Sequence, residues 1–209
     1  MIIIGAKGLA KELLEIAVQN GEKNIVFYDD VSNDLPEKLY NIFPILRSEI
    51  EADKYISQVD SRFVLGLGNP HLRQKMFEKF KRFGGIPFTL ISKNAEIGSF
   101  ENEIGEGTIV TSGVIITNSI KIGKGALINL NCTIGHDTVI GDFVELTPNV
   151  NISGHCLISN NVFIGTSASI IPNISIGKNT VIGAGSVVTK DLPENVLAVG
   201  IPAVIKKNL

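Results

Sequence analysis

The sequence predicts two successive parts, a small α/β domain in residues 1–88 and an all-β parallel β-helix in residues 89–209. Three observations lead to this fold class. The chain has 209 residues, which is longer than a typical single domain. Strand-like and helix-like patterns alternate in the first part, and from Ile104 to Val188 an aliphatic residue returns at every sixth position. We therefore expect two domains of different architecture.

Composition limits the classes of partner. The formal net charge is −2 and charged residues make up 19% of the chain, so there is no basic footprint for nucleic acid. The apolar start MIII is too short for the core of a signal peptide, and no run of about 20 apolar residues predicts a membrane span. We expect a cytoplasmic protein that binds small molecules, with neither nucleic acid nor membrane as partner.

The pattern of the first 88 residues resembles a small Rossmann-like unit. Strands are predicted in MIII, NIVFYD (24–29) and RFVLGLG (62–68), and helices near residues 8–20 and 70–82. Residues 31–60 are interpreted as loop and peripheral structure. His71, at the start of the second helix, is expected to be structural. The basic residues of that helix are interpreted as a solvated face: Arg73, Lys75, Lys79, Lys81 and Arg82.

Two turns in this part are candidate ligand sites. The turn GAKGLA (5–10) leads from a strand into a helix and can direct backbone N–H groups at a phosphate, with two aspartates about twenty residues later near a ribose or base. The turn GLGNP (66–70) also follows a strand, at the end where open α/β sheets bind ligands. The three-glycine fingerprint is incomplete, so tight turns with packing glycines stay open as the alternative. The candidate substrate-binding residues are Gly5, Ala6, Lys7, Gly8, Asp29, Asp30, Gly68 and Asn69.

The second part has a period of six. Helices do not fit, since six is not a multiple of 3.6, and hairpins need alternation with longer spacing, so a solenoid of short parallel strands remains. Three hexapeptides close one triangular coil, residues eighteen apart stack at about 4.8 Å, and five coils result. Fifteen aliphatic positions carry the period: Ile104, Val110, Ile116, Ile122, Ile128, Ile134, Ile140, Leu146, Ile152, Ile158, Ile164, Ile170, Ile176, Ile182 and Val188.

Two further regularities accompany the aliphatic positions. Glycine commonly follows them, as at Gly105, Gly135 and Gly165, which we attribute to corners that need unusual dihedral angles. Four residues beyond each aliphatic position comes a mostly small or β-branched residue, which forms a second inward column. Cys132 and Cys156 belong to this column. We expect both as buried packing residues rather than as a disulfide.

One turn of the repeat carries a titratable pair, His136 and Asp137, within TIGHDTVIGD (133–142). By the eighteen-residue stacking, Asn118 lies one coil before His136, Gly154 lies one coil after it, and His155 stacks over Asp137. An outward turn residue is the plain interpretation of His136. An imidazole is also the side chain that most often accepts a proton near neutral pH, which makes this turn a candidate catalytic site.

Seven motifs spread over nearly the whole chain carry a family resemblance: GAKGLAKE, YDD, GLGNPHLR, INLNCTIGHD, FIGTSASI, VIGAGSVVTKDLP and VGIPAVIKK. With them the chain resembles the left-handed β-helix acyltransferase superfamily, in particular its sugar acetyltransferase branch from bacterial glycan pathways. That branch includes N-acetyltransferases of nucleotide-linked amino sugars and sialic acid O-acetyltransferases. The resemblance implies a left-handed coil, against the usual crossover preference. It also implies acetyl-CoA as co-substrate and a homotrimer with active sites between subunits.

The resemblance implies roles for single residues as well. His136 is the general base, and Asp137 orients its ring or stabilises the imidazolium. Gly154 leaves room for acetyl-CoA, and its N–H binds the thioester oxygen. Asn129 helps to hold the sugar, and Asn118 is grouped with it from its place in the His136 column. The other candidate cofactor contacts are Glu145, where some relatives carry a second histidine, Thr166 and Ala184 along the pantetheine channel, and Lys206 and Lys207 near the CoA phosphates.

The expected activity is acetyl-CoA-dependent N-acetylation of a nucleotide-linked 4-amino-deoxysugar in bacterial surface glycan biosynthesis, with no metal. O-acetylation of a sialic acid or a related sugar is the alternative, because the same base can deprotonate a hydroxyl. The choice among uridine, thymidine and guanosine stays open. A metalloenzyme of the carbonic anhydrase type needs three histidine ligands around zinc, whereas the β-helix holds two histidines. A non-enzymatic scaffold or ligand-binding role also stays open.

Overall fold

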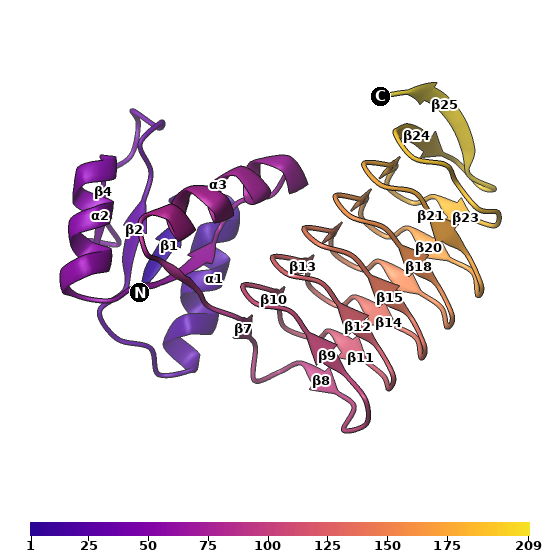
Figure 1. The fold of residues 1–209 in the computed structure, drawn as a ribbon, viewed down its shortest axis with the longest axis horizontal. Helices are drawn as coiled ribbons and strands as arrows, with labels where there is room; N and C mark the ends of the chain where they lie inside the picture. Colours follow the sequence, from indigo (N-terminus) through magenta and orange to yellow (C-terminus); the bar gives the residue numbers. More distant parts are fainter.

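The computed structural model describes residues 1–209 and shows two parts, a mixed α/β domain and a long coil of short strands (Figure 1). The first part has a six-stranded sheet in the order β3-β4-β2-β1-β5-β6, in which all neighbours run parallel except β3 and β4. None of its helices has the length and hydropathy of a membrane span. The elements of this part are β1 (Ile2–Ile4), α1 (Gly8–Gln19), β2 (Val26–Tyr28), β3 (Lys38–Leu39), β4 (Phe43–Leu46), α2 (Glu49–Gln58), β5 (Arg62–Leu65), α3 (Pro70–Arg82) and β6 (Ile86–Pro87).

Strand β1 is the centre of this sheet. Its three isoleucines are at most 1% exposed, because β2 and β5 pair with it on either side and helices cover it. In register, Ile4 stands beside Tyr28 of β2 and Leu65 of β5. The three strands therefore end at the same level, and the turns that follow them meet at one edge of the sheet.

The helices predicted near residues 8–20 and 70–82 are confirmed, but the interpretation of residues 31–60 as loop is wrong. Strand β4 pairs with β2 and extends the sheet, and α2 follows it. The start of α2 had a sequence signal that we did not use: Ser48 and Glu51 have the spacing of a capping box. The Ser48 hydroxyl accepts a hydrogen bond from the Glu51 N–H at 3.3 Å.

From Leu90 onward the chain winds in triangular coils, and its strands form three faces in which all neighbours run parallel except β24 and β25. The first face contains β7 (Leu90–Ile91), β10 (Ile109–Val110), β13 (Leu127–Ile128), β16 (Glu145–Leu146), β19 (Phe163–Ile164), β22 (Val181–Ile182), β24 (Val196–Val199) and β25 (Val204–Asn208). The second contains β8 (Glu96–Ile97), β11 (Ile115–Ile116), β14 (Thr133–Ile134), β17 (Asn151–Ile152), β20 (Ser169–Ile170) and β23 (Val187–Val188). The third contains β9 (Glu103–Ile104), β12 (Lys121–Ile122), β15 (Val139–Ile140), β18 (Leu157–Ile158) and β21 (Ser175–Ile176).

The predicted stacking of residues eighteen apart is confirmed, for example where Leu127 pairs with Glu145 and Glu145 with Phe163. The coil begins earlier than the period of six indicated, since β7 and β8 precede the fifteen predicted strands. Ile91 and Ile97 keep the period between themselves. Ile104 comes seven positions after Ile97 instead of six, and this one-residue insertion hid the first two strands from the count.

The aliphatic and small inward columns form the core of the coil, and both cysteines lie in it as free, buried thiols, as predicted. Burial raises the pKa of the Cys132 thiol to about 11. The explanation offered for the glycines was wrong. Gly135 does not have a positive φ; a Cβ added to it would meet the Gly154 nitrogen at 2.6 Å. Glycine is needed here because successive coils approach closely, and not because the corner needs unusual dihedral angles.

The left-handed conformation occurs instead two residues after that glycine position. At most corners it is taken by residue types that tolerate it. The residues with positive φ along the middle coils are Asn131, Asp137, Phe143, Asn149, His155, Asn161, Ser167, Asn173 and Asn179. The bulky Phe143 is the exception. It packs edge-on against Phe77 of α3, with 5.3 Å between ring centroids, and so joins the two parts of the molecule.

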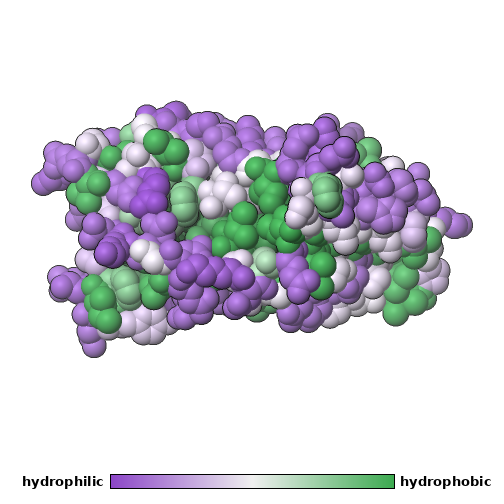
Figure 2. All heavy atoms as spheres, turned by 90° about the horizontal axis from the view of Figure 1, so that it is seen from below, coloured by the Kyte–Doolittle hydropathy of each residue, from purple (hydrophilic) through white to green (hydrophobic).

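The α/β domain covers one face of the coil and leaves two uncovered. On the first face, the outward side chains of Leu90, Ile109 and Leu127 are fully buried in the core of the α/β domain. On the third face, outward Val139 is 40% and Leu157 is 49% exposed. Figure 2 shows apolar surface gathered near the middle of the molecule. Exposed apolar patches of this kind commonly mark contact surfaces.

Candidate active site

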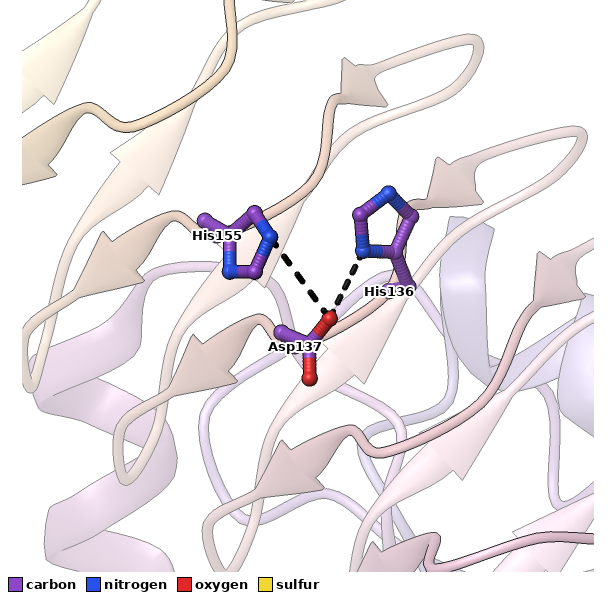
Figure 3. Close-up of side chains that lie close together, drawn as sticks. All are labelled: His136, Asp137 and His155. Carbon is purple, nitrogen blue, oxygen red and sulfur yellow. Dashed lines mark hydrogen bonds and ion pairs between the residues drawn. The ribbon is translucent and has the colours of Figure 1, made fainter.

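His136 and Asp137 lie at the corner between β14 and β15, and their side chains meet (Figure 3). Asp137 has a φ of 58°, and its N–H donates to the Asn118 carbonyl at 3.3 Å. His136 Nδ1 lies 2.7 Å from Asp137 Oδ2. An ionised carboxylate only accepts hydrogen bonds, so Nδ1 carries the ring proton and donates a hydrogen bond to Asp137. The Nε2 lone pair is thereby left free to accept a proton from a ligand.

Gly154 lies directly beside the His136 ring, one coil further on. A Cβ added to Gly154 would lie 2.7 Å from Cε1 and 2.8 Å from Nε2 of His136. Any side chain here would displace the ring. The Gly154 N–H donates to no acceptor within the chain. The corner thus holds a proton acceptor next to a backbone donor that is buried beside the His136 ring.

His155 adds a second imidazole to this corner. Its N–H donates to the His136 carbonyl at 2.8 Å, which ties the two coils together. Its Nε2 lies 3.7 Å from Asp137 Oδ2, and the two rings stand edge to face with centroids 4.9 Å apart. The side chains of His136, Asp137 and His155 are 62%, 47% and 56% exposed. Figure 3 shows both imidazoles turned toward the one carboxylate.

The other predicted residues of the coil divide between two corners. Asn118 stands on the corner of His136, one coil earlier, and its Oδ1 accepts a hydrogen bond from the Phe100 N–H at 3.2 Å. The corner that follows the first face carries Asn129, Thr166 and Ala184 instead. Lys206 and Lys207 lie on the exposed strand β25. One chain therefore does not gather all these residues around a single ligand.

The two predicted turns of the α/β domain form one pocket of about 400 Å³. The structure brings seven of the eight predicted residues to its lining. Asn69 is the exception: it caps α3, where its side chain accepts a hydrogen bond from the Leu72 N–H at 3.1 Å. The lining also includes residues that we did not predict, among them Tyr28, Ser32, Leu72 and Met76. The predicted residues at the pocket are Gly5, Ala6, Lys7, Gly8, Asp29, Asp30 and Gly68.

Both aspartates of this pocket have partners in the chain. Asp30 accepts a hydrogen bond from the Tyr28 hydroxyl at 2.6 Å and lies 3.4 Å from the Lys79 ammonium. Burial acts to raise the pKa of Asp30, but these two groups outweigh it and lower the pKa. Burial and the bond to Asp30 raise the pKa of Tyr28 to about 12. Asp29 accepts from the N–H groups of Val31 (3.2 Å) and Ser32 (2.9 Å), which shapes the loop after β2.

The interpretation of the α3 basic residues as a solvated face is wrong for Lys79, whose side chain is 15% exposed and pairs with Asp30 and Glu49, and for Arg73. The Arg73 side chain is fully buried, and burial lowers the pKa of its guanidinium to about 10. Nη1 donates to the carbonyls of Leu65 (3.3 Å) and Leu67 (3.0 Å), and Nη2 donates to the carbonyl of Gly125 on the coil. Arg73 thus joins the end of β5 to the β-helix.

Glu145 also lies at this junction and not on the exposed surface that the expected cofactor contact requires. It is 6% exposed on β16, under the α/β domain. A Cβ added to Gly68 would lie 3.3 Å from Glu145 Oε1, so the carboxylate supports the second turn of the pocket. Burial raises the pKa of Glu145, and the charge of Arg73 opposes that rise.

Residues 1–80 match the model of the PglD N-terminal domain, and residues 155–190 match the bacterial transferase hexapeptide (six repeats). The GDP-perosamine N-acetyltransferase of Escherichia coli O157:H7 is 30% identical over 206 residues, which are 95% of this chain and 81% of that protein.

Solved structures agree in fold. A histidine-to-asparagine variant of perosamine N-acetyltransferase from Caulobacter crescentus, in complex with CoA and GDP-perosamine, has a TM-score of 0.91 at 32% identity over 99% of this chain and 96% of that chain. The acetyltransferase domain of PglB from Neisseria gonorrhoeae FA1090, in complex with acetyl coenzyme A, has a TM-score of 0.86 at 26% identity over 100% and 98%. These matches and the many parallel strands fit a left-handed β-helix after a small α/β domain. Since a relative at 30% identity spans nearly its whole length, this chain belongs to the family of hexapeptide-repeat sugar N-acetyltransferases that includes GDP-perosamine N-acetyltransferase.

Proposed function

We propose that this protein transfers the acetyl group of acetyl-CoA to the amino group of a nucleotide-linked 4-amino-deoxysugar, with His136 as general base. The observation that carries this proposal is the corner at His136. A ring held by Asp137 keeps its Nε2 lone pair free, 2.8 Å from where a Cβ of Gly154 would stand. Relatives of this chain are sugar N-acetyltransferases that bind CoA and GDP-perosamine.

The geometry supports a direct transfer. The sugar amine attacks the thioester carbon, and His136 Nε2 accepts the proton that the nitrogen loses. Asp137 stabilises the imidazolium, since Nδ1 already donates to its carboxylate at 2.7 Å. The free N–H of Gly154 binds the oxygen on which negative charge develops. The C–S bond then breaks, and the CoA thiolate takes the proton back from His136.

In this proposal residues 1–88 are a Rossmann-like domain that binds the nucleotide, and residues 89–209 are the acetyltransferase domain with a C-terminal extension. The phosphates lie at the turn Gly5–Gly8, before the N-terminus of α1, and the ribose lies toward Asp29 and Asp30. GDP is the preferred nucleotide among those left open, because relatives over nearly the whole chain act on or bind GDP-perosamine. Both co-substrates suit an enzyme of the cytoplasm.

The active form is a homotrimer in which each site lies between subunits. Two observations support this. The candidate residues divide between the corner that carries His136 and the corner that carries Thr166, on different edges of one β-helix, so one ligand reaches both sets only if two chains contribute. The second and third faces of the coil lack the cover that the α/β domain gives the first, and the third carries the exposed apolar residues Val139 and Leu157.

The test is an acceptor panel. The protein is incubated with acetyl-CoA and UDP-, dTDP- or GDP-linked 4-amino-deoxysugars, with free sialic acid as a separate acceptor, and release of the CoA thiol is followed. We expect turnover with a GDP-linked amino sugar and loss of turnover in His136→Asn. Turnover with sialic acid alone would replace N-acetylation by O-acetylation. Turnover with no acceptor, in a protein that still binds acetyl-CoA, would contradict the proposal.

A further inference from the structure

The corner at His136 has the chemistry of a metal site in addition to that of a base. Two imidazole nitrogens and one carboxylate oxygen converge there, from His136, His155 and Asp137, with all ligand atoms within 4.8 Å of one another. Mixed nitrogen and carboxylate ligands suit zinc, cobalt, nickel and ferrous iron, whereas magnesium and calcium prefer sites made of oxygen. Two histidines alone do not make a zinc site, but Asp137 supplies a third ligand beside them.

The two separations that include Asp137 can be compared with the spacing of a tetrahedral site, and the third pair lies within 4.8 Å. Bonds of about 2.0–2.1 Å to a tetrahedral zinc place neighbouring ligand atoms about 3.3 Å apart. Asp137 Oδ2 lies 2.7 Å from His136 Nδ1 and 3.7 Å from His155 Nε2, so the observed separations lie on either side of that value. Small rotations of exposed side chains close the difference. Their exposure leaves the remaining coordination positions open to water.

The backbone holds these three residues in place. His155 follows His136 by nineteen residues, one coil and one position further, and its N–H donates to the His136 carbonyl at 2.8 Å. Asp137 and His155 share the left-handed conformation, with φ of 58° and 57°, so their side chains leave equivalent points of successive coils. Gly154 lets the His136 ring lie flat beside the next coil. The backbone positions of the three ligand residues are thus set before an ion arrives.

A metal at this corner is incompatible with the base. In the free protein His136 carries its proton on Nδ1 and its lone pair on Nε2, because Nδ1 donates to Asp137. A metal ion binds Nδ1 through a lone pair, so Nδ1 must lose its proton. The single proton of the neutral ring then lies on Nε2. Nε2 in this form is a donor and accepts no proton from an amine.

We propose that His136, Asp137 and His155 form an inhibitory site for a divalent transition-metal ion, so that zinc binding and acetyl transfer exclude each other. The ion coordinates His136 Nδ1, Asp137 Oδ2 and His155 Nε2, with water in the open position. The inhibition rests on the proposed role of His136, whereas the binding of the ion does not.

Binding is measured first, without any activity assay. Full-length protein, free of any histidine tag, is titrated with Co²⁺ and followed by its visible absorption, and Zn²⁺ is then added to displace the cobalt. We expect one Co²⁺ per chain and its loss in His155→Asn and Asp137→Asn. His71→Asn is the matched control, because His71 is the third histidine of the chain and lies outside the cluster; it should bind as the unaltered protein does. Circular dichroism verifies that each variant is folded.

Inhibition is measured second. Zn²⁺ should stop acetyl transfer by the unaltered protein, EDTA should restore it, and Mg²⁺ should have no effect. For His155→Asn the ratio of rates with and without Zn²⁺ should approach one, with its own metal-free rate as the reference. Cobalt binding without inhibition would remove the inhibitory role and leave the site. Equal cobalt binding by His155→Asn and the unaltered protein, or no binding by the unaltered protein at micromolar concentrations, would overturn the site itself.

Discussion

Two polar clusters of this molecule, one at the junction of the two domains and one at a corner of the β-helix, differ in burial and in the partners of their side chains. At the junction, Arg73 and Glu145 are buried between the two domains, and burial shifts both of their pKa values toward the neutral form. At the corner, His136, Asp137 and His155 are about half exposed. One nitrogen of each imidazole lies near Asp137 Oδ2, at 2.7 Å for His136 and 3.7 Å for His155. The junction cluster fixes the position of one domain on the other. The corner cluster is reachable by ligands.

The difference shows that burial, more than residue type, decides what a charged group does. A buried guanidinium whose donors point at backbone carbonyls is held in a single arrangement, because leaving those carbonyls unpaired costs free energy. An exposed imidazole with one nitrogen held keeps its other nitrogen free for chemistry. Substitutions at the junction should therefore reduce stability, and substitutions at the corner should reduce rate.

The largest expected effect is at the corner. His136→Asn removes the proton acceptor, and we expect the rate of acetyl transfer to fall by about 10²–10⁴-fold, the usual contribution of a general base. Binding of the nucleotide sugar, measured by calorimetry, should persist, as in the Caulobacter relative, whose histidine-to-asparagine variant was solved with CoA and GDP-perosamine bound. A rate that falls less than threefold would assign the base to another residue, with His155 the first candidate.

At the junction the expected effect is on folding. Arg73→Met leaves the carbonyls of Leu67 and Gly125 without their donor and Glu145 without its neighbouring cation, so the free energy of unfolding should fall by about 3–5 kcal/mol. Urea denaturation measures this. Lys75→Met, at an exposed position of the same helix, is the control and should change stability by less than about 0.5 kcal/mol. Equal stability of the two variants would contradict the assigned role of Arg73.

A third substitution, Gly154→Ala, tests whether the small size of residue 154 supports catalysis by keeping the His136 ring in position. Gly154→Ala places a Cβ within 2.8 Å of Nε2, which must displace the ring, and we expect kcat to fall by about 10²-fold. The same change made in the His136→Asn background should have little further effect, because the displaced group is gone. Additive losses in the double variant would show that Gly154 acts independently of the ring.

The smallest effect concerns pH and the junction. The fold raises the pKa of Glu145 above its ordinary 4.5, so the folded state holds this proton more tightly than the unfolded chain does. The resulting stability is fully present below pH 4.5 and is lost as the pH rises through the raised pKa. Glu145→Gln should lack this decline in urea titrations from about pH 5 to pH 8. Glu103→Gln, an exposed carboxyl, should retain it, and an unchanged decline in Glu145→Gln would place its origin elsewhere.

The periodic part of the fold was predictable because residues eighteen positions apart in the β-helix lie in equivalent environments. That rule alone placed Gly154 beside His136 and His155 beside Asp137. It failed between Ile97 and Ile104, where a single inserted residue hides two strands from a count of six. The eighteen-residue rule also could not predict the contact between His136 and Asp137. These adjacent side chains meet only because the backbone of Asp137 is left-handed.

The α/β part was less predictable because its contacts join residues far apart in the chain. The two glycine turns were identified as candidates, and they meet because β1, β2 and β5 end in register. Strand β4 (FPIL) contains Pro44, a residue that argues against a strand inside a sheet, so the sequence gave no sign that it pairs with β2. Arg73 and Glu145 come from opposite domains. Nothing local to either residue indicates that the other lies nearby.

The left-handed residue at each corner has a consequence for how this fold evolves. Asparagine, aspartate and histidine all tolerate that conformation, so they can replace one another at Asn131, Asn149 or Asn173 with little cost to the backbone. Each exchange would bring a new functional group to the surface at a spacing already set by the coil. During evolution, reactive side chains can therefore appear or disappear at single corners of the β-helix while its backbone fold is unchanged.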